Sequence, residues 1–289
     1  MVAMGIVADI VELYRRAACD LPPDVAESLL RAEREEEGTA KACMGMILEN
    51  IKIAREERRP ICQDTGTPIF WVERPEGMSE RAITDAIIGA TKKATEEVPL
   101  RPNSVNPVTG KNSKNNIGEG VPLITFTEVG KDMPLKISLL LKGGGSENVG
   151  LTYKLPSDFG ERDIEGVKRC VINAVRRAQG NGCPPGIVGV AFGSPKALVA
   201  NAALKQFLRR LDDRNPDPVL GNLESDLEKE LNLIGIGPMG FGGKSTVLGV
   251  KVAAVSRHPA SFFVEVAYNC WALRRATVTF TESGVVYGY

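Results

Sequence analysis

Helical and strand-like segments follow one another irregularly along the chain, and this order limits the possible folds more than any other feature. Apolar residues at helical spacing fill most of the first 57 positions, in segments 5–18, 24–36 and 39–57. Beyond residue 60, short strand-like runs are interspersed with helices and show no repeated strand–helix–strand period. We therefore expect an α+β fold, with a helical N-terminal region followed by mixed β-sheets with flanking helices, in one domain covering 1–289.

Later segments can be assigned from the same patterns. Helices are expected at 79–98, 161–179 and 195–210, with a further charged helix after 215–222. Strands are expected at 68–73, 122–127, 135–141 and 187–191, and strand-like patterns return from Leu233 to the end of the chain. The runs 122–127 and 135–141 are joined by a short polar stretch, which predicts a β-hairpin. Residues 101–120 contain almost nothing to bury, as is typical of a functional or disordered loop.

Charge and composition exclude several classes of protein. The 36 Lys and Arg residues balance 36 Asp and Glu residues, so no overall positive field favours nucleic acid. The chain has no run of 18 apolar residues, and its N-terminal arginines follow the apolar residues, unlike a secretory signal. We expect a cytoplasmic protein that does not bind membranes, in which the six cysteines stay reduced. With one histidine, a His-rich zinc site is excluded.

The cysteines fall into two groups by their surroundings. Cys62 in CQDTG, Cys183 in GNGCPPG and Cys270 in YNCWALRR each lie at a break in regular structure, where the backbone can turn sulfur atoms toward a common centre. These three are candidate metal ligands, and scattered reduced thiols are the alternative that their spacing leaves open. The remaining cysteines lie in helical patterns and are expected to be buried packing residues: Cys19, Cys43 and Cys170.

Two glycine-rich segments and the histidine invite functional interpretations. Segment 235–245 (GIGPMGFGGKS) approaches two nucleotide-binding motifs, but a strand-like run follows it and Pro238 replaces a required glycine, so an irregular tight turn is favoured. Segment 142–148 (KGGGSEN) could present backbone N–H groups to an anion, or be a flexible turn. His258, between Arg257 and Pro259, is compatible with either a structural or a catalytic role.

Six segments in order resemble one family. They are ICQDTGTPIF, LRPNSVNP, KGGGSEN, GNGCPPGIVGVAFG, GIGPMGFGGKS and SRHPASFFVEVAYNCWALRRA. Together they are similar to the iron–sulfur-dependent hydro-lyases, namely the alpha subunit or N-terminal half of class I fumarases and L-tartrate dehydratases. The resemblance runs from roughly residue 5 to the end of the chain.

The resemblance implies a cofactor and a set of site residues. Cys62, Cys183 and Cys270 would hold a [4Fe-4S] cluster with one open iron, at loops where the parts of the fold meet. Arg101 could pair with a substrate carboxylate and the glycine N–H groups could bind the other. His258 would be the catalytic residue that contacts the substrate or the leaving hydroxyl. The implied substrate-binding residues are Gln63, Asp64, Arg101, Gly144 and Gly145.

The resemblance also implies an activity and a partner. A class I fumarase would reversibly hydrate fumarate to (S)-malate, a reaction of the tricarboxylic acid cycle, and an L-tartrate dehydratase alpha subunit is the close alternative. Single-chain family members are about twice as long, so we expect a separate beta subunit that completes the site, with further dimerisation. A non-catalytic or electron-transfer iron–sulfur protein is an alternative of another class, which ligation by four cysteines would favour.

Overall fold

The computed structural model describes residues 2–289, with side chains from residue 5 onward. These residues form two compact units. Unit 1 contains the chain up to Pro22, then Glu49–Gly143 and Arg274–Tyr289; unit 2 contains Pro23–Leu48 and Gly144–Leu273. Helix α3 (Gly38–Glu57) contributes residues to both. Helices and mixed sheets occur in each unit, which confirms the predicted α+β class.

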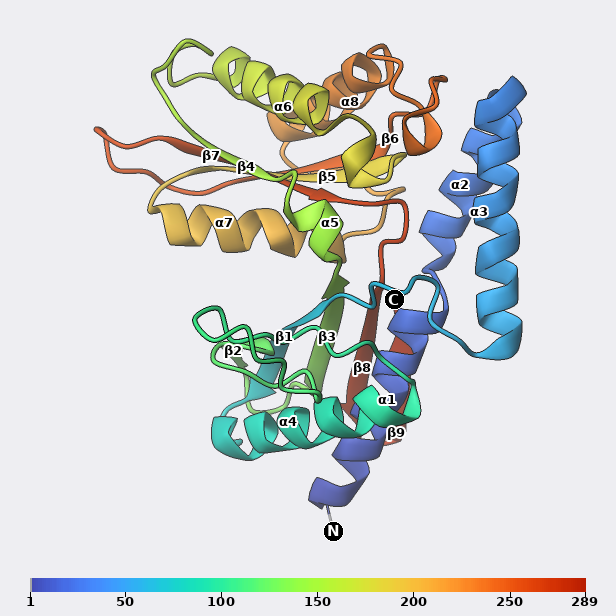
Figure 1. The fold of residues 1–289 in the computed structure, drawn as a ribbon. Coiled ribbons are helices and arrows are strands. Elements are labelled where there is room, and N and C mark those ends of the chain that lie inside the picture. The colour runs from blue at the N-terminus through green and yellow to red at the C-terminus, as the bar shows by residue number, and fades with distance from the viewer. Residues whose placement is uncertain (1) are drawn as a thin grey trace. The chain divides into compact units, whose positions relative to one another are not determined.

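Unit 1 is built on a five-stranded sheet of strand order β2-β1-β3-β8-β9 (Figure 1). Strand β1 pairs in parallel with β2 and antiparallel with β3. The strands are β1 (Thr67–Pro75), β2 (Leu123–Val129), β3 (Leu135–Lys142), β8 (Arg275–Thr281) and β9 (Gly284–Gly288).

The predicted hairpin between the second and third of these strands is wrong. Both β2 and β3 pair with β1, which lies between them. The burial pattern gives the reason: residues 68–72 of β1 are all buried, as are most of β3, whereas β2 has no buried residue. A continuously buried strand such as β1 favours a central place in the sheet, and the less buried β2 takes the edge.

Helices α1 (Val2–Cys19) and α4 (Glu80–Glu97) supply the core of unit 1. Ile10, Leu13 and Tyr14 lie on one face of α1 and are fully buried against α4 and the sheet. Ser79 caps the start of α4, since its hydroxyl accepts a hydrogen bond from the N–H of Ala82 at 3.3 Å. The predicted start of α4 is therefore confirmed.

Unit 2 is a three-layer structure around a four-stranded sheet of order β4-β7-β5-β6. Helices α6 and α8 pack on one face and α7 on the other (Figure 1). Every residue of β5 is buried, as expected for a central strand covered on both faces. The strands are β4 (Leu151–Lys154), β5 (Gly186–Gly193), β6 (Val247–Ala254) and β7 (Phe263–Asn269); the helices are α2 (Pro23–Glu35), α5 (Gly144–Glu147), α6 (Ile164–Ala178), α7 (Lys196–Lys205) and α8 (Pro218–Asn232).

Three segments of unit 2 differ from the sequence prediction. Strand β4 and helix α5 were not predicted, because four residues are too few to show a period. The strand-like pattern expected from Leu233 is not a strand until β6 begins at Val247. Between them the chain forms a glycine-rich loop with a short 3₁₀ turn at Pro238–Gly240.

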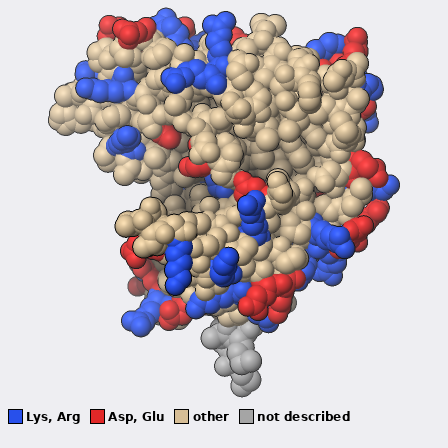
Figure 2. All heavy atoms as spheres, in the orientation of Figure 1, with Lys and Arg blue, Asp and Glu red and all other residues tan. Residues whose placement is uncertain are grey.

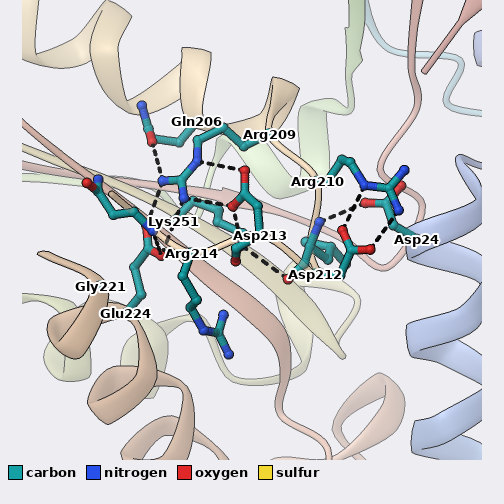
Figure 3. Close-up of polar contacts among 12 residues, drawn as sticks. Asp24, Gln206, Arg209, Arg210, Asp212, Asp213, Arg214, Gly221, Glu224 and Lys251 are labelled. Carbon is teal, nitrogen blue, oxygen red and sulfur yellow. Dashed lines mark hydrogen bonds and ion pairs between the residues drawn. The ribbon is translucent and has the colours of Figure 1, made fainter. Parts of the chain in front are cut away.

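A buried ionic network holds the connection between α7 and α8 against β6 (Figure 3). Lys251 on β6 is fully buried, and its Nζ donates to Asp213 Oδ1 at 2.9 Å and to the carbonyl of Leu211 at 3.1 Å. Glu224 on α8 is also fully buried and accepts from Arg209 at 2.6 Å. Burial lowers the pKa of Lys251. This network anchors the connecting loop to the sheet.

Two features of the structure concern the membrane and nucleic-acid classes considered above, namely the length of its apolar helices and its surface charge. Within residues 2–289, no helix is both long and apolar enough to cross a membrane. On the face drawn in Figure 2, Lys and Arg side chains are interspersed with Asp and Glu side chains. On that face the two signs of charge are therefore mixed and not segregated into patches.

Candidate functional site

In unit 1 the Cys62–Gly66 turn is packed tightly against the end of β3. Gly66 has a φ of +85°, and a Cβ at this position would lie 2.7 Å from the backbone carbon of Leu141. Only glycine fits such a close approach in this conformation. The Asp64 Oδ1 accepts a hydrogen bond from the Gly66 N–H at 3.0 Å, which closes the turn. The turn presents Cys62 and Asp64 partly exposed and Gln63 exposed.

The turn is joined to the segment that carries Arg101. The Thr65 hydroxyl accepts from the Arg101 N–H at 3.1 Å, and the Asn103 side chain donates to the Gly66 carbonyl at 3.2 Å. Asn116, only 2% exposed, donates to the Arg101 carbonyl at 3.1 Å and accepts from the Asn103 N–H at 2.7 Å. Four of the predicted site residues are thus brought together in unit 1: Cys62, Gln63, Asp64 and Arg101.

In unit 2 the other two candidate ligands lie side by side. Cys183 follows a 3₁₀ turn, η1 (Gln179–Gly182), and adopts a left-handed conformation with φ 53°. Its carbonyl accepts a hydrogen bond from the N–H of Trp271, the residue after Cys270, at 3.3 Å. Cys270 follows β7, and its thiol donates to the carbonyl of Ala272 at 3.8 Å. The chain reversals predicted from Gly and Pro therefore place both sulfur atoms in one region.

The buried ring of Tyr268 packs against the turn that carries Cys183. Its ring is 2% exposed and lies against Gly182 and Gly186, where an added Cβ would approach ring atoms to 2.4 Å and 2.2 Å, respectively. The two glycines on either side of Cys183 are therefore required by the volume of the ring. Burial, together with the nearby Cys270 and Cys183, raises the pKa of Tyr268, so its hydroxyl stays protonated at neutral pH.

Gly144 and Gly145 form the first turn of α5. This short helix contacts η1 and β7, the two elements that precede Cys183 and Cys270. A Cβ at Gly145 would meet nothing within 4 Å, so there is open space beside this backbone. The structure thus brings the predicted anion-binding glycines close to the two cysteines of unit 2.

His258 lies apart from these cysteines. Its backbone N–H donates to the Ser194 hydroxyl at 2.8 Å, which holds it beyond the end of β5. Cys270 follows the opposite end of β7, a seven-residue strand that spans about 20 Å. The Ala260 N–H donates to His258 Nδ1 at 3.1 Å, so the proton of the neutral ring is on Nε2. His258 is exposed, and unit 2 alone does not bring it to the cysteines.

The glycine-rich loop 235–245 is an irregular turn, as predicted. Gly235, Gly237 and Gly240 have positive φ angles, which glycine adopts without strain. The N–H groups of Lys244 and Ser245 bind the carboxylate of Glu36, at 2.9 Å and 2.6 Å from its Oε1. The part of the loop that resembles a phosphate-binding motif therefore holds a side chain of this protein.

The two predicted groups of cysteines differ in their exposure to solvent. Cys62, Cys183 and Cys270 are partly exposed, and no cysteine of the described chain forms a disulfide. Burial raises the pKa of Cys19 and of Cys170 to about 11. The packing thiols are Cys19, Cys43 and Cys170, and all three are buried as predicted.

The three partly exposed thiols suit an iron–sulfur site by their chemistry. Thiolates on irregular turns are the usual protein ligands of iron–sulfur clusters. Cys62 belongs to unit 1, and Cys183 and Cys270 belong to unit 2. Across residues 2–289, no three His, Cys, Asp or Glu side chains are grouped as ready-made ligands of a metal ion. The ligand set therefore stays a prediction.

Comparison with known proteins identifies the family. The family model described as "Fumarate hydratase (Fumerase)" matches residues 7–279, nearly the whole chain. The chain belongs to this family of hydro-lyases. The resemblance inferred from the six sequence segments is thereby confirmed.

Individual relatives fall on both sides of the fumarase and tartrate dehydratase division. A putative class I fumarate hydratase of Geobacillus stearothermophilus is 43% identical over 274 residues, which are 92% of this chain and 53% of the relative. A putative L(+)-tartrate dehydratase subunit alpha of Methanocaldococcus jannaschii is 40% identical over 92% of this chain and 94% of its own length. The Escherichia coli L(+)-tartrate dehydratase subunit alpha is 33% identical over 89% of this chain and 85% of its own length. The chain thus spans about half the length of the Geobacillus relative.

The sequence prediction missed the residues that support the site of this family member. Thr65, Asn103 and Asn116 hold the Cys62 turn and the Arg101 segment together, and Tyr268 supports both cysteines of unit 2. Thr65, Asn103 and Tyr268 lie within the six family segments and Asn116 lies in the 101–120 loop, but a side chain whose contacts are with a distant segment leaves no periodic signal. Proximity to the motifs was the only available indication.

Proposed function

We propose that this chain is the cluster-bearing part of a hydro-lyase that reversibly hydrates fumarate to (S)-malate. Its two units would act together as one catalytic-subunit domain over residues 1–289. A [4Fe-4S] cluster would be held by Cys62, Cys183 and Cys270, with one iron left without a cysteine ligand. The family membership supports the reaction class, and the sorting of the thiols supports the ligand set.

One observation carries this proposal. Of six cysteines, the three on irregular turns are partly exposed and form no disulfide, and an arginine or the glycine N–H groups of α5, which can bind an anion, lie near them. Cys62 is followed by Gln63 and Asp64 and lies near Arg101, while Cys183 and Cys270 lie near the α5 turn. An electron-transfer protein would need no carboxylate-binding groups. The described chain also has no fourth cysteine on an irregular turn that would complete the ligand set of such a protein.

The residues of this chain would bind and orient a dicarboxylate. Arg101 is exposed, and its planar guanidinium can bind one carboxylate through two hydrogen bonds. The backbone N–H groups of Gly144 and Gly145 would bind the other carboxylate, and Gln63 and Asp64 would form hydrogen bonds with the substrate hydroxyl. When bound, the cluster supplies a Lewis-acidic iron that polarises the C2 hydroxyl. Fixing both carboxylates would orient the C3 proton toward its acceptor.

His258 would take part through Nε2. Because Nδ1 accepts a hydrogen bond from Ala260, the Nε2–H of the neutral ring can donate to a substrate oxygen or to the leaving hydroxyl. Because His258 lies beyond the end of β5, away from Cys183 and Cys270, the proposed contact with the substrate would require an arrangement that unit 2 alone does not give. Replacement by asparagine should retain a donor but lose proton transfer, so kcat should fall more than KM changes.

A partner would complete the enzyme. The Geobacillus relative is about twice as long as the matched region, and two other relatives are named as alpha subunits. We propose that a beta subunit supplies the remaining substrate contacts and the base that accepts the C3 proton, in the cytoplasm. The complex would dimerise further.

Dehydration of L-tartrate is the second candidate reaction. It is favoured by the two relatives named as tartrate dehydratase alpha subunits, whose lengths this chain covers to 94% and 85%. The chemistry at C2 and C3 is the same, and only the second hydroxyl distinguishes the substrate. Both substrates must therefore be assayed.

The test is anaerobic co-expression with the beta subunit, followed by iron and sulfide analysis and assays on fumarate, malate and tartrate. Cys62→Ser, Cys183→Ser and Cys270→Ser should each abolish turnover and release iron, whereas Cys43→Ser, at a buried helical thiol, should retain both. Equal effects at all four positions would refute the ligand assignment. Full activity of an iron-free complex would refute the cluster mechanism.

A further inference from the structure

Arg274 connects the Cys62 turn to the end of β3. It lies four residues after Cys270, immediately before β8, and is 2% exposed. Its Nη1 donates a short hydrogen bond to the carbonyl of Asp64, and its own carbonyl accepts from the Leu141 N–H at 2.9 Å. One residue of unit 1 thus contacts both the Cys62 turn and β3, the strand that leads into the glycine segment.

The positive charge of Arg274 is not balanced by the described residues. The contact with Asp64 is to its backbone, and within residues 2–289 no carboxylate forms an ion pair with this guanidinium. Its buried Nε has no hydrogen-bond partner in the same part of the chain. Burying a cation without a counter-charge is unfavourable, and proteins normally pair such groups. A negatively charged group held near the turn would provide the missing partner.

We propose that Arg274 is a positioning residue that fixes the Cys62 turn and supplies buried positive charge to an anion bound there. The inference rests on the proposed function, in which the anion is the thiolate-ligated cluster or a substrate carboxylate. The guanidinium suits both tasks, because its planar set of donors can hold a backbone carbonyl with one nitrogen and face an anion with another. A lysine has the charge but not this geometry.

The positioning role is tested in the cluster-free full-length chain by hydrogen exchange of the peptide 61–68. Arg274→Lys and Arg274→Gln should each exchange at least about tenfold faster there, the change expected when a hydrogen bond from a charged donor is lost. The matched control is Arg15→Gln, which removes a guanidinium that donates to the Glu97 carbonyl elsewhere in unit 1. Unchanged exchange at 61–68 in both Arg274 variants would overturn the positioning role.

The charge is tested in the reconstituted complex with its beta subunit, by iron per chain and by steady-state kinetics. If the anion is the cluster, Arg274→Gln should retain less than half the iron of the wild type, and Arg274→Lys should retain most of it. If the anion is a substrate carboxylate, Arg274→Gln should keep its iron but show at least about a tenfold higher KM, whereas Arg274→Lys should show a smaller rise. Wild-type iron and KM in Arg274→Gln would overturn the inference.

Failure of the proposed function would give a different result. If the wild-type complex binds no iron and hydrates no dicarboxylate, the proposed function fails, yet the exchange measurement on the cluster-free chain still decides whether Arg274 fixes the turn. If the wild-type complex is active and Arg274→Gln matches it in every measurement, the proposed function stands and the role of Arg274 is refuted.

Discussion

Adding a methyl group at Gly186 should destabilise unit 2 and disturb the Cys183 turn. The new Cβ would lie 2.2 Å from Cζ and Oη of Tyr268, whereas carbon contacts are favourable from about 3.5 Å, so the ring or the turn must move by about 1.3 Å. The ring is 2% exposed and is confined on the side of Gly182 as well. Gly186 has no positive φ, so the penalty comes from overpacking alone. We expect a loss of about 3 kcal/mol, the upper end of the usual range for overpacked cores.

The assay is urea unfolding followed by Trp271 fluorescence in a Trp71→Phe background, so that the signal reports unit 2. Gly249→Ala is the matched control, because its Cβ would meet Leu211 at 3.5 Å, an ordinary contact, and its effect should stay within about 1 kcal/mol. In a Tyr268→Leu background the ring is absent, and Gly186→Ala should cost little. An equal cost of Gly186→Ala with and without the Tyr268 ring would refute the packing argument.

Three further predictions concern other parts of the molecule. Glu224→Gln should destabilise unit 2 by about 3 kcal/mol in the same urea assay, since it leaves Arg209 with one carboxylate fewer in the buried network of Figure 3; exposed Glu230→Gln should change little, and equal effects would contradict this. In the native apo-protein at pH 8, Cys19 and Cys170, with pKa values raised to about 11 by burial, should have only about one thiolate in a thousand; mass spectrometry should therefore find iodoacetamide modification first at the three candidate ligands, and equal rates at all six thiols would contradict the sorting. Burial raises the pKa of Glu265 in the folded state, so the stability that its protonated form contributes is present at low pH and is lost as pH rises through the folded-state pKa. Glu265→Gln should therefore raise Tm at pH 7 and raise it less at pH 4. A rise in Tm that does not depend on pH would refute this.

Much of the fold could be predicted because its elements carry their own local signals. The helices of the first 57 residues show helical spacing, and α4 has a serine at its start. The partners of a strand leave no such signal. Strands β2 and β3 are adjacent in sequence, but the continuous buried run of β1 takes the place between them. A short connection between two strands therefore does not predict a hairpin when a third, more deeply buried strand can pair with both of them.

In the candidate site, too, some residues carry a local sequence signal and others do not. Cys62, Cys183 and Cys270 could be separated from the other thiols because Gly and Pro mark the turns that carry them. Tyr268 and Arg274 could not be assigned, since their importance lies in contacts with Gly186 and Asp64, which are distant in sequence. His258 marks a different limit, because it precedes β7 and Cys270 follows it, so the length of the strand separates two residues that the family resemblance assigns to one site.

The order of synthesis has a consequence for the two units. Unit 2 ends at Leu273, whereas unit 1 contains residues that precede unit 2 but lacks β8 and β9 until residues 274–289 have been made. Domains usually fold in the order in which they leave the ribosome, but here the unit that starts first must finish last. Because Arg274 belongs to the segment 274–289, the Cys62 turn can reach its native contacts only after all of unit 2 has been synthesised.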